Sequence, residues 1–304
     1  MQKLISPRQA ARAIGVSEST LKRWCDQGLI RTTKTAGGHR RMEVEAVVQF
    51  LRESDHEVVE PELLGLPAGV GASLTLDSSV SESLLEALIA GEDVLSRKLV
   101  FDLLLSGLPI TALCDDLLTP VFHRIGEKWS CGDVAIYQER RACEVCLRIL
   151  HELRRTFHRV AADAPLAVGA TPEGDIYSLP VCMAEQVLRS FGWNATLLGS
   201  GLPAETLELA VSETRPQLVW ISVSHIEDER RFVDGVNRVF ATADRIGSPL
   251  IIGGRALTPQ LRKRIQFSAH GETFRDLERF ARSLHRTDLS PTPPADQLHD
   301  ELPQ

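Results

Sequence analysis

The chain has 304 residues, is 43% hydrophobic and carries a net charge of −7, so it can bury a sizeable core in about two or three domains. It contains no apolar run of the roughly 20 residues that a membrane-spanning helix needs, and its first residues lack the apolar segment of a signal peptide. Its six cysteines follow no disulfide-like spacing, which is typical of a reducing compartment. We therefore expect a cytoplasmic protein with no membrane partner.

Positive charge is concentrated at the start of the chain. Residues 1–52 carry ten Lys and Arg against four Asp and Glu, a charge of +6, so the remainder carries −13. A basic domain joined to an acidic body is the pattern expected of a protein whose first domain binds polyanions. We therefore expect a nucleic-acid-binding head over residues 1–54.

The segment 6-SPRQAARAIGVSESTLKRWCDQGLI-30 contains two short helical patterns on either side of Gly15. Ser17 is a good N-cap for the second helix, and Leu21 and Trp24 form the apolar face of that helix. This spacing predicts a helix-turn-helix. The side chains that then point away from the core, where a recognition helix meets bases and phosphates, are Ser19, Thr20, Lys22 and Arg23.

The next stretch, 31-RTTKTAGGHRRMEVEAVVQFL-51, predicts a basic wing followed by a short helix. Gly37 and Gly38 allow the backbone to turn tightly. Five basic side chains gather around this turn: Arg31, Lys34, His39, Arg40 and Arg41. Such a wing can lie along a phosphate backbone, with Thr hydroxyl and backbone N–H groups as further donors.

The rest of the chain predicts a multidomain protein. Residues 55–80 hold two prolines and three glycines without a sustained period, which indicates a linker. Over 81–161 apolar residues recur at helical spacing, which predicts a four-helix bundle. Over 165–287 short apolar runs alternate with helical patterns, which predicts an open, doubly wound α/β domain of Rossmann-like (flavodoxin-like) type with a five-stranded parallel sheet. The acidic, proline-rich end, 288–304, is expected to be disordered.

Polar loops follow several of the predicted strands. The first is 171-TPEGDIYSLP-180, and the others are 199-GSGLP-203, 222-SVSH-225 and 253-GGRAL-257. In open parallel sheets, ligands bind at the carboxyl ends of the strands. We therefore expect these loops to form a ligand site.

The head resembles the DNA-binding domain of MerR-family transcription regulators. The resemblance rests on a helix-turn-helix, then GGHRR, then a short helix, and it covers about 50 residues. It implies that the head binds double-stranded operator DNA. The alternative to DNA binding is a basic surface that only faces solvent. It does not explain why the charge excess is confined to the elements that would touch DNA.

The body resembles the cobalamin-binding module of methionine synthases and of the cobalamin-dependent photoreceptor regulators of the CarH type. In that family the first loop carries an acidic residue, then a histidine that is the lower axial ligand of cobalt, and a second histidine covers the upper face of the corrin. The nucleotide tail lies near a Ser-x-Ser strand end and a Gly-Gly turn. The positions of this chain that match the family's pocket are Trp129, Glu139, Arg140, Glu173, Asp175, Tyr177, Ser222, Ser224, Gly253 and Gly254.

Both expected histidines are replaced, the lower one by Tyr177 and the upper one by Arg140. Neutral imidazole is a good metal ligand near neutral pH, whereas tyrosine with an ordinary pKa of about 10 is mostly protonated there. Arginine stays protonated and cannot ligate a metal. The resemblance therefore implies cobalamin as a cofactor, while the residues argue against cobalt ligation.

Three outcomes are open for this pocket. They are a pocket that has lost cobalamin dependence and collapsed into a scaffold for oligomerisation, a pocket that binds cobalamin weakly in the base-on form, and a pocket that binds another flat or anionic molecule, with Arg140 as a carboxylate clamp. We rank the loss of cobalamin dependence first. The pair Cys143 and Cys146 lies on one helical face and is expected to be buried rather than metal-binding.

No phosphate-binding loop, nucleophile elbow, HExxH or dinucleotide motif is present in the sequence, so we do not expect an enzyme. Our interpretation is a DNA-binding transcription regulator, most simply a repressor, whose body forms a dimer or tetramer. The alternatives are a sensor that binds haem or another tetrapyrrole, and a regulator controlled by a protein antagonist that covers the head.

Overall fold

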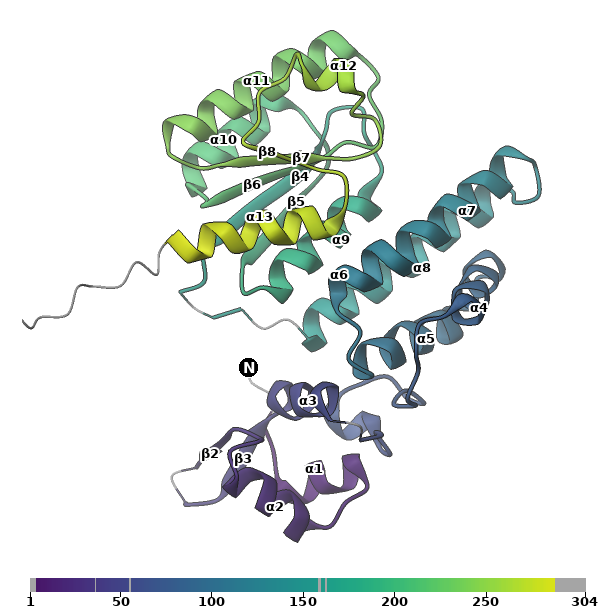
Figure 1. Ribbon diagram of the computed structural model, residues 1–304, viewed down its shortest axis with the longest axis vertical. Coiled ribbons are helices and arrows are strands. Elements are labelled where there is room, and N and C mark those ends of the chain that lie inside the picture. The colour runs from purple at the N-terminus through teal and green to yellow at the C-terminus, as the bar shows by residue number, and fades with distance from the viewer. Residues whose placement is uncertain (1–3, 36, 55, 158–159, 162, 288–304) are drawn as a thin grey trace, which may run out of the picture.

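The computed structural model describes residues 4–35, 37–54, 56–157, 160–161 and 163–287 (Figure 1). Along these ranges the chain forms a small mixed head, a helical bundle and an α/β domain, in the order expected from the sequence. No helix within them is long and apolar enough to cross a membrane. The expected disorder of 288–304 concerns residues outside the described ranges.

The head pairs a helix-turn-helix with a three-stranded antiparallel sheet in the order β1-β3-β2. Its elements are β1 (Leu4–Ile5), α1 (Pro7–Ile14), α2 (Glu18–Asp26), β2 (Thr32–Lys34), β3 (Arg40–Glu43) and α3 (Val44–Glu53). Ser6 and Gln9 form a capping box at the start of α1. Gly15, at φ 75°, ends α1 in the left-handed conformation that favours glycine and so sets the turn into α2.

The segment expected as a linker has more structure than its sequence indicates. It contains the short helix η1 (Pro61–Leu64), and the backbone N–H groups of Val59 and Glu60 donate to the carbonyl of Ala13 in the head. Farther along, the N–H of Gly71 donates to the buried Asp102 carboxylate of the bundle at 2.7 Å. Apolar side chains without a regular period are buried here: Val58, Leu64, Leu66 and Val70. Because these contacts are tertiary, no local pattern announces them.

The bundle is built from α4 (Ser78–Ala90), α5 (Asp93–Leu105), α6 (Ile110–Ala112), η2 (Leu113–Leu118), α7 (Thr119–Ser130) and α8 (Ile136–Phe157). The elements α6, η2 and α7 follow one another without a break, and η2 has π-helical hydrogen bonding. Pro120 lies just beyond η2. Because proline has no N–H to donate to the preceding turn, it disfavours regular α-helical pairing at this point.

The α/β domain has an all-parallel sheet in the order β5-β4-β6-β7-β8. Its elements are β4 (Leu166–Pro172), α9 (Ser178–Ser190), β5 (Asn194–Leu202), α10 (Ala204–Thr214), β6 (Leu218–Ser222), α11 (Glu229–Arg245), β7 (Leu250–Gly253), α12 (Pro259–Arg262), β8 (Ala269–Gly271) and α13 (Phe274–Thr287). Helices α9 and α13 cover the sheet face nearer the bundle, and α10, α11 and α12 cover the other face (Figure 1). The strand order reverses between β4 and β6, which is where such sheets bind ligands.

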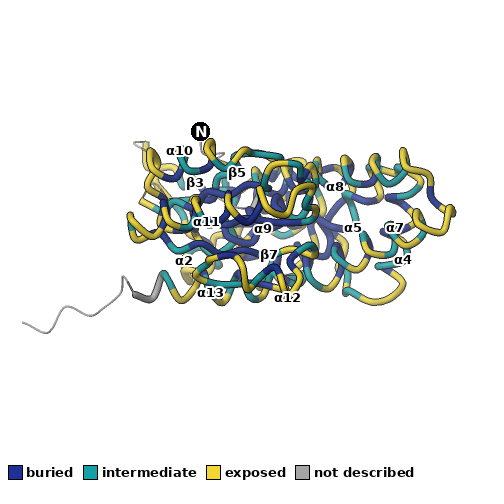
Figure 2. The backbone as a smooth tube through the Cα atoms, turned by 90° about the horizontal axis from the view of Figure 1, so that it is seen from above, coloured by how far each residue is buried: buried dark blue, intermediate teal, exposed yellow. Residues whose placement is uncertain are grey.

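The buried residues form two clusters that follow these layers. One runs from the head through the bundle to the sheet face under α9 and α13, and the other lies between the sheet and α10 to α12. The buried backbone accordingly continues from the sheet through α9 toward α5 and α8 (Figure 2). The bundle and the α/β domain are therefore packed against each other along α8 and α9.

Candidate DNA-binding surface and inter-domain cavity

Helix α2 is oriented by its cap and by its apolar face. The Ser17 hydroxyl accepts a hydrogen bond from the Thr20 N–H at 3.1 Å, and Leu21 is fully buried. Trp24 packs against Phe50 of α3, with ring centroids 4.8 Å apart. In this orientation of α2, three of the four expected contact residues are exposed, namely Ser19, Lys22 and Arg23. Thr20 is half-buried.

The wing is the hairpin between β2 and β3. The N–H of Thr35 donates to the His39 carbonyl, and Gly38 adopts φ 77° in the turn. The wing residues Arg31, Lys34, Gly37, Gly38 and His39 are exposed, as expected for a surface that meets a phosphate backbone.

Two arginines of the wing are less free than the sequence indicates. Arg40 and Arg41 are half-buried in β3. The Arg40 guanidinium lies 2.6 Å from the Asp26 carboxylate at the end of α2. Arg40 therefore joins the wing to α2, and part of its charge is neutralised within the head.

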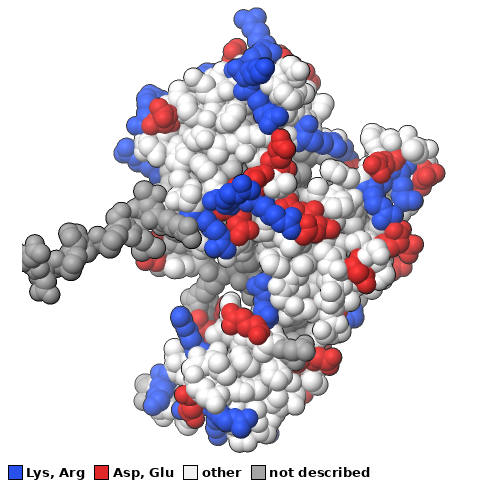
Figure 3. Space-filling model, in the orientation of Figure 1, with Lys and Arg blue, Asp and Glu red and all other residues white. Residues whose placement is uncertain are grey.

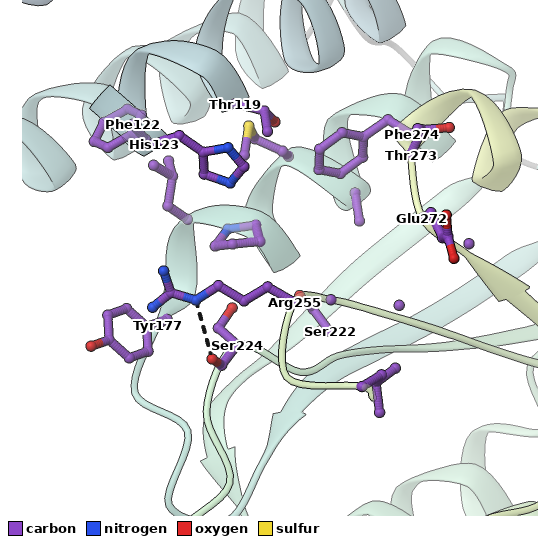
Figure 4. A pocket seen from close by; sticks show the side chains of 18 of the residues that line it. Thr119, Phe122, His123, Tyr177, Ser222, Ser224, Arg255, Glu272, Thr273 and Phe274 are labelled. Atoms are coloured by element: carbon purple, nitrogen blue, oxygen red, sulfur yellow. Dashed lines mark hydrogen bonds between the residues drawn. The ribbon is translucent and has the colours of Figure 1, made fainter. Parts of the chain in front are cut away.

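A cavity of about 950 Å³ lies between the bundle and the carboxyl edge of the sheet. Phe122 and His123 of α7 enter it from the bundle side, and Tyr177 and Arg255 lie at the strand ends (Figure 4). Phe274 closes a third side from the start of α13. Most of the wall is apolar, and it includes Leu179, Met183, Trp220 and Ile251.

Eight of the ten residues expected in the ligand pocket line this cavity. They come from α7, α8, the β4–α9 loop and the ends of β6 and β7: Trp129, Glu139, Arg140, Tyr177, Ser222, Ser224, Gly253 and Gly254. Gly254 is required at its position, because it has φ 122° and a Cβ there would lie 2.2 Å from the Val223 carbonyl oxygen.

The two other expected pocket residues have structural partners instead. Glu173 forms an ion pair with Arg231 of α11 at 2.9 Å. Asp175 is fully buried, and its carboxylate accepts hydrogen bonds from the N–H groups of Tyr177, Ser224 and His225. Asp175 therefore joins the loops after β4 and β6. Burial raises the pKa of its carboxyl group, and the three N–H donors oppose that change.

Tyr177 lies between groups that the sequence did not connect. The Arg140 Cζ is 5.6 Å from the centroid of the Tyr177 ring, and the Arg255 Cζ is 5.4 Å from it. Both distances are within the range of a cation–π interaction. Arg255 was not among the residues we expected in the pocket, although its place directly after Gly253 and Gly254 is a signal for a strand-end loop.

The residues around Arg140 also have partners. Arg140 Nε lies 3.4 Å from the Glu139 carboxylate, and the Cys143 thiol donates to Glu139 at 3.5 Å. Burial and the negative charge of Glu139 raise the pKa of Cys143 to about 12. Cys143 is therefore a neutral thiol at physiological pH rather than a metal-binding thiolate.

The remaining cysteines and histidines offer few metal ligands. Cys146 is buried, as expected, and burial raises its pKa well above the ordinary value, whereas Cys143 is only half-buried. His123 and His270 line the cavity, whereas His225 is exposed on the loop after β6. Burial and then the neighbouring Arg262 lower the pKa of His270. Within the described residues no group of three or more His, Cys, Asp or Glu side chains is suited to hold a metal ion.

The cavity has the location expected for cobalamin, but the two expected ligand positions hold no histidine. The residues at the two expected cobalt-ligand positions, Arg140 and Tyr177, contact each other. One of them cannot ligate a metal, and the other presents its ring to two guanidinium groups. The residues at these positions therefore do not fit an axially ligated cobalt.

Comparison with known protein families finds a match in the head and another in the bundle. Residues 4–55 match a helix-turn-helix domain, and residues 80–154 match a B12 binding domain. The chain thus joins a segment that matches a helix-turn-helix domain to one that matches a B12 binding domain. Among curated proteins it is similar to the HTH-type transcriptional repressor CarH of Myxococcus xanthus, with 27% identity over 81% of this chain and 87% of that protein.

Two further relatives extend the comparison. The HTH-type transcriptional repressor CarA of Myxococcus xanthus is 26% identical over 81% of this chain and 85% of its own length. The solved monomethylamine corrinoid protein of Methanosarcina barkeri covers 69% of this chain and all of its own, with a TM-score of 0.58 and 16% identity, which shows a shared fold. The resemblance to CarH-type regulators predicted from the sequence is confirmed.

Proposed function

We propose that this protein is a cytoplasmic, non-enzymatic transcription repressor that binds double-stranded operator DNA through its head. The observation that carries this proposal is the position of α2 and the wing: the exposed residues of both elements belong to the same small domain, in which residues 1–52 carry a charge of +6. The similarity to the repressors CarH and CarA over 81% of the chain supports the same function.

The head supplies two kinds of contact. Ser19, Thr20, Lys22 and Arg23 of α2 read the major groove and its flanking phosphates. The wing follows the phosphate backbone with Arg31, Lys34, His39 and Arg41, while the Gly38 N–H closes the turn by donating to the Thr35 carbonyl. Arg40, held by Asp26, fixes the angle between wing and helix.

The test starts from DNA selected out of a random duplex pool by the full-length protein. Fluorescence anisotropy then measures the affinity for the selected duplex and for a scrambled one at several salt concentrations. We expect preference for the selected duplex and an affinity that falls steeply with salt. Equal binding to both duplexes would overturn the proposal of an operator-specific repressor.

We further propose that the body forms a homo-oligomer without cobalt ligation. The contact between Arg140 and Tyr177, at the two positions where histidine ligands were expected, supports the absence of cobalt ligation. Sedimentation and anisotropy with adenosylcobalamin, in the dark and after illumination, test this directly. We expect one oligomeric state and one DNA affinity in all conditions. Light-dependent dissociation of the assembly would contradict it, and a monomer throughout would remove the role in oligomerisation.

A second candidate function is a ligand sensor that uses the same cavity. Two observations favour it: the cavity volume of about 950 Å³, and the buried Trp220, whose indole N–H has no acceptor among the described residues. The occupant would be haem, another tetrapyrrole or weakly held base-on cobalamin. An absorption spectrum of the protein as purified separates the candidates, since a Soret band or a corrinoid band would favour the sensor.

A third candidate is control by a protein antagonist that covers the exposed basic residues of α2 and the wing. Capture experiments with the full-length protein, with and without excess selected DNA, test it. An antagonist of this kind is displaced by DNA, whereas a partner of the body is not.

A further inference from the structure

Three side chains from three separate elements meet at one point of the inter-domain cavity. Arg140 belongs to the first part of α8, Tyr177 is the N-cap residue of α9, and Arg255 follows β7. Both guanidinium carbons lie within 6 Å of the Tyr177 ring centroid, at 5.6 and 5.4 Å. We call these three residues the Tyr177 clasp.

On the α/β side, the clasp is held in place by hydrogen bonds through the buried Asp175. One carboxylate oxygen accepts from the Tyr177 N–H at 3.0 Å, and the other accepts from the Ser224 N–H at 2.6 Å. The Ser224 carbonyl in turn accepts from Arg255 Nε at 3.3 Å (Figure 4). The backbone of Tyr177 and the side chain of Arg255 therefore belong to one network, anchored on a carboxylate that solvent does not reach.

On the bundle side, the clasp is attached through α8. Arg140 is oriented by Glu139 at 3.4 Å, and α8 packs along α9. A cation–π contact from Arg140 to Tyr177 thus connects the bundle to the loop network of the sheet. Tyrosine is suited to this role because its ring face attracts a cation without needing the hydroxyl group.

The contact leaves no room for a flat ring between Arg140 and Tyr177. A planar molecule packs at about 3.5 Å from the atoms on each of its faces, so two such contacts need a separation of about 7 Å. The observed separation of 5.6 Å is smaller. A macrocycle gripped between these two positions would therefore have to break the clasp.

We propose that the Tyr177 clasp takes the place of a cofactor: in addition to the packing of α8 on α9, it links the bundle to the strand-end loops of the α/β domain, and it bars a planar macrocycle from the space between Arg140 and Tyr177. This inference rests on the proposed function only in that the body works without cobalt. It goes further because it assigns the closing role to the tyrosine ring and names Arg255 as its third member.

The experiment compares wild type with Tyr177→Phe, Tyr177→Leu and Arg140→Met in the full-length protein. Tyr177→Phe is the matched control, because it keeps the ring and removes the hydroxyl. Hydrogen exchange of the amides in residues 136–141 and 173–178 reports on the contact. We expect Tyr177→Leu and Arg140→Met to exchange about fivefold to tenfold faster there, and Tyr177→Phe to match wild type.

Cobalamin supplies the second measurement, with hydroxocobalamin as the probe. We expect Arg140→Ala combined with Tyr177→His to bind it at least about tenfold more tightly than wild type by absorbance titration, because the barrier is gone and an imidazole is supplied. The inference is overturned if wild type binds as tightly as this variant, if Tyr177→Phe exchanges as fast as Tyr177→Leu, or if neither Tyr177→Leu nor Arg140→Met changes exchange.

Binding of the selected duplex by the same variants keeps the two proposals apart. If the exchange measurements overturn the clasp but wild type still prefers the selected duplex, the repressor function stands. Absence of operator preference in wild type overturns the repressor function and does not affect the exchange measurement of the clasp.

Discussion

The head and the body of this protein use their arginines in opposite ways. In the head, Arg23 and Arg31 are exposed on α2 and the wing, so their charge is available to an outside partner. In the body, arginines mostly have acidic partners within the chain, as Arg275 does with Asp115 and Asp116. Figure 3 shows basic and acidic side chains interleaved where α13 meets the bundle. The difference teaches that net charge by segment locates a polyanion-binding surface, whereas charge inside the body is used for internal contacts.

The buried carboxylate of Asp175 offers the largest expected effect. Asp175→Ala removes a buried carboxylate that accepts hydrogen bonds from three backbone N–H groups and leaves those donors without a partner. We expect a loss of about 3 kcal/mol in the free energy of unfolding, measured by denaturant titration. The exposed Asp244→Ala is the control and should change little. A loss below about 1 kcal/mol would show that Asp175 does not hold the two loops together.

The exposed arginines of the head offer the next largest effect. Arg23→Ala should weaken binding to the selected duplex by about tenfold to a hundredfold and relax the preference over the scrambled duplex, because the proposed major-groove contact is lost. The folding of the head should not change, since Arg23 is exposed. Arg279→Ala, an equally charged change on α13, should leave anisotropy binding curves unchanged. Equal losses for both variants would mean that only overall charge matters.

In the Arg40–Asp26 ion pair, an arginine of the head has an acidic partner within the chain, as arginines of the body do. Asp26→Ala removes an acidic group beside α2 and frees the Arg40 guanidinium, which lies 2.6 Å from it. We expect a modest gain in DNA affinity, about twofold to threefold, with a slightly steeper salt dependence. A decrease in affinity would show that the orientation given by the pair is worth more than the released charge.

The pH dependence of stability tests the environment of the buried Glu185 in the body. It is fully buried on α9, with Arg154 Nη1 at 3.0 Å, and burial raises its pKa while Arg154 opposes this. A raised folded-state pKa contributes stability that is present below the ordinary value and is lost as the pH rises through the folded value. Glu185→Gln should therefore gain stability relative to wild type as the pH rises from 4 to 7 in denaturant titrations. The exposed Glu213→Gln should show no such trend, and a fall in the relative stability of Glu185→Gln would refute the assignment.

Much of the fold could be predicted because its signals are local. Apolar periodicity, Ser17 as a cap and Gly15 as a stop specify the helix-turn-helix within 25 residues. The alternation of short apolar runs and helical patterns likewise predicted five parallel strands. The packing of Val58, Leu64, Leu66 and Val70 was missed, because burial in an aperiodic segment depends on partners far away in the chain.

The candidate ligand site was predicted in outline and differs in its details. The strand-end loops do meet at the cavity, since parallel strands share one carboxyl edge. These partners of Glu173 and Asp175 could not be foreseen, because Arg231 comes from α11 and the N–H groups of Ser224 and His225 come from the loop after β6. Arg255 and Phe274 also line the cavity and could not be foreseen, because they too come from other segments of the chain.

By itself, the sequence determined the order of the three parts, the basic head and the absence of histidine at two informative positions, because charge, periodicity and residue type are properties of the chain. The tertiary structure alone decided how the residues at those positions interact. Arg140, Tyr177 and Arg255 are separated by tens of residues, and only the docking of α8 on α9 and the shared edge of the sheet bring them within 6 Å. A cation and a ring attract each other only at that range, so the clasp exists only in the folded protein.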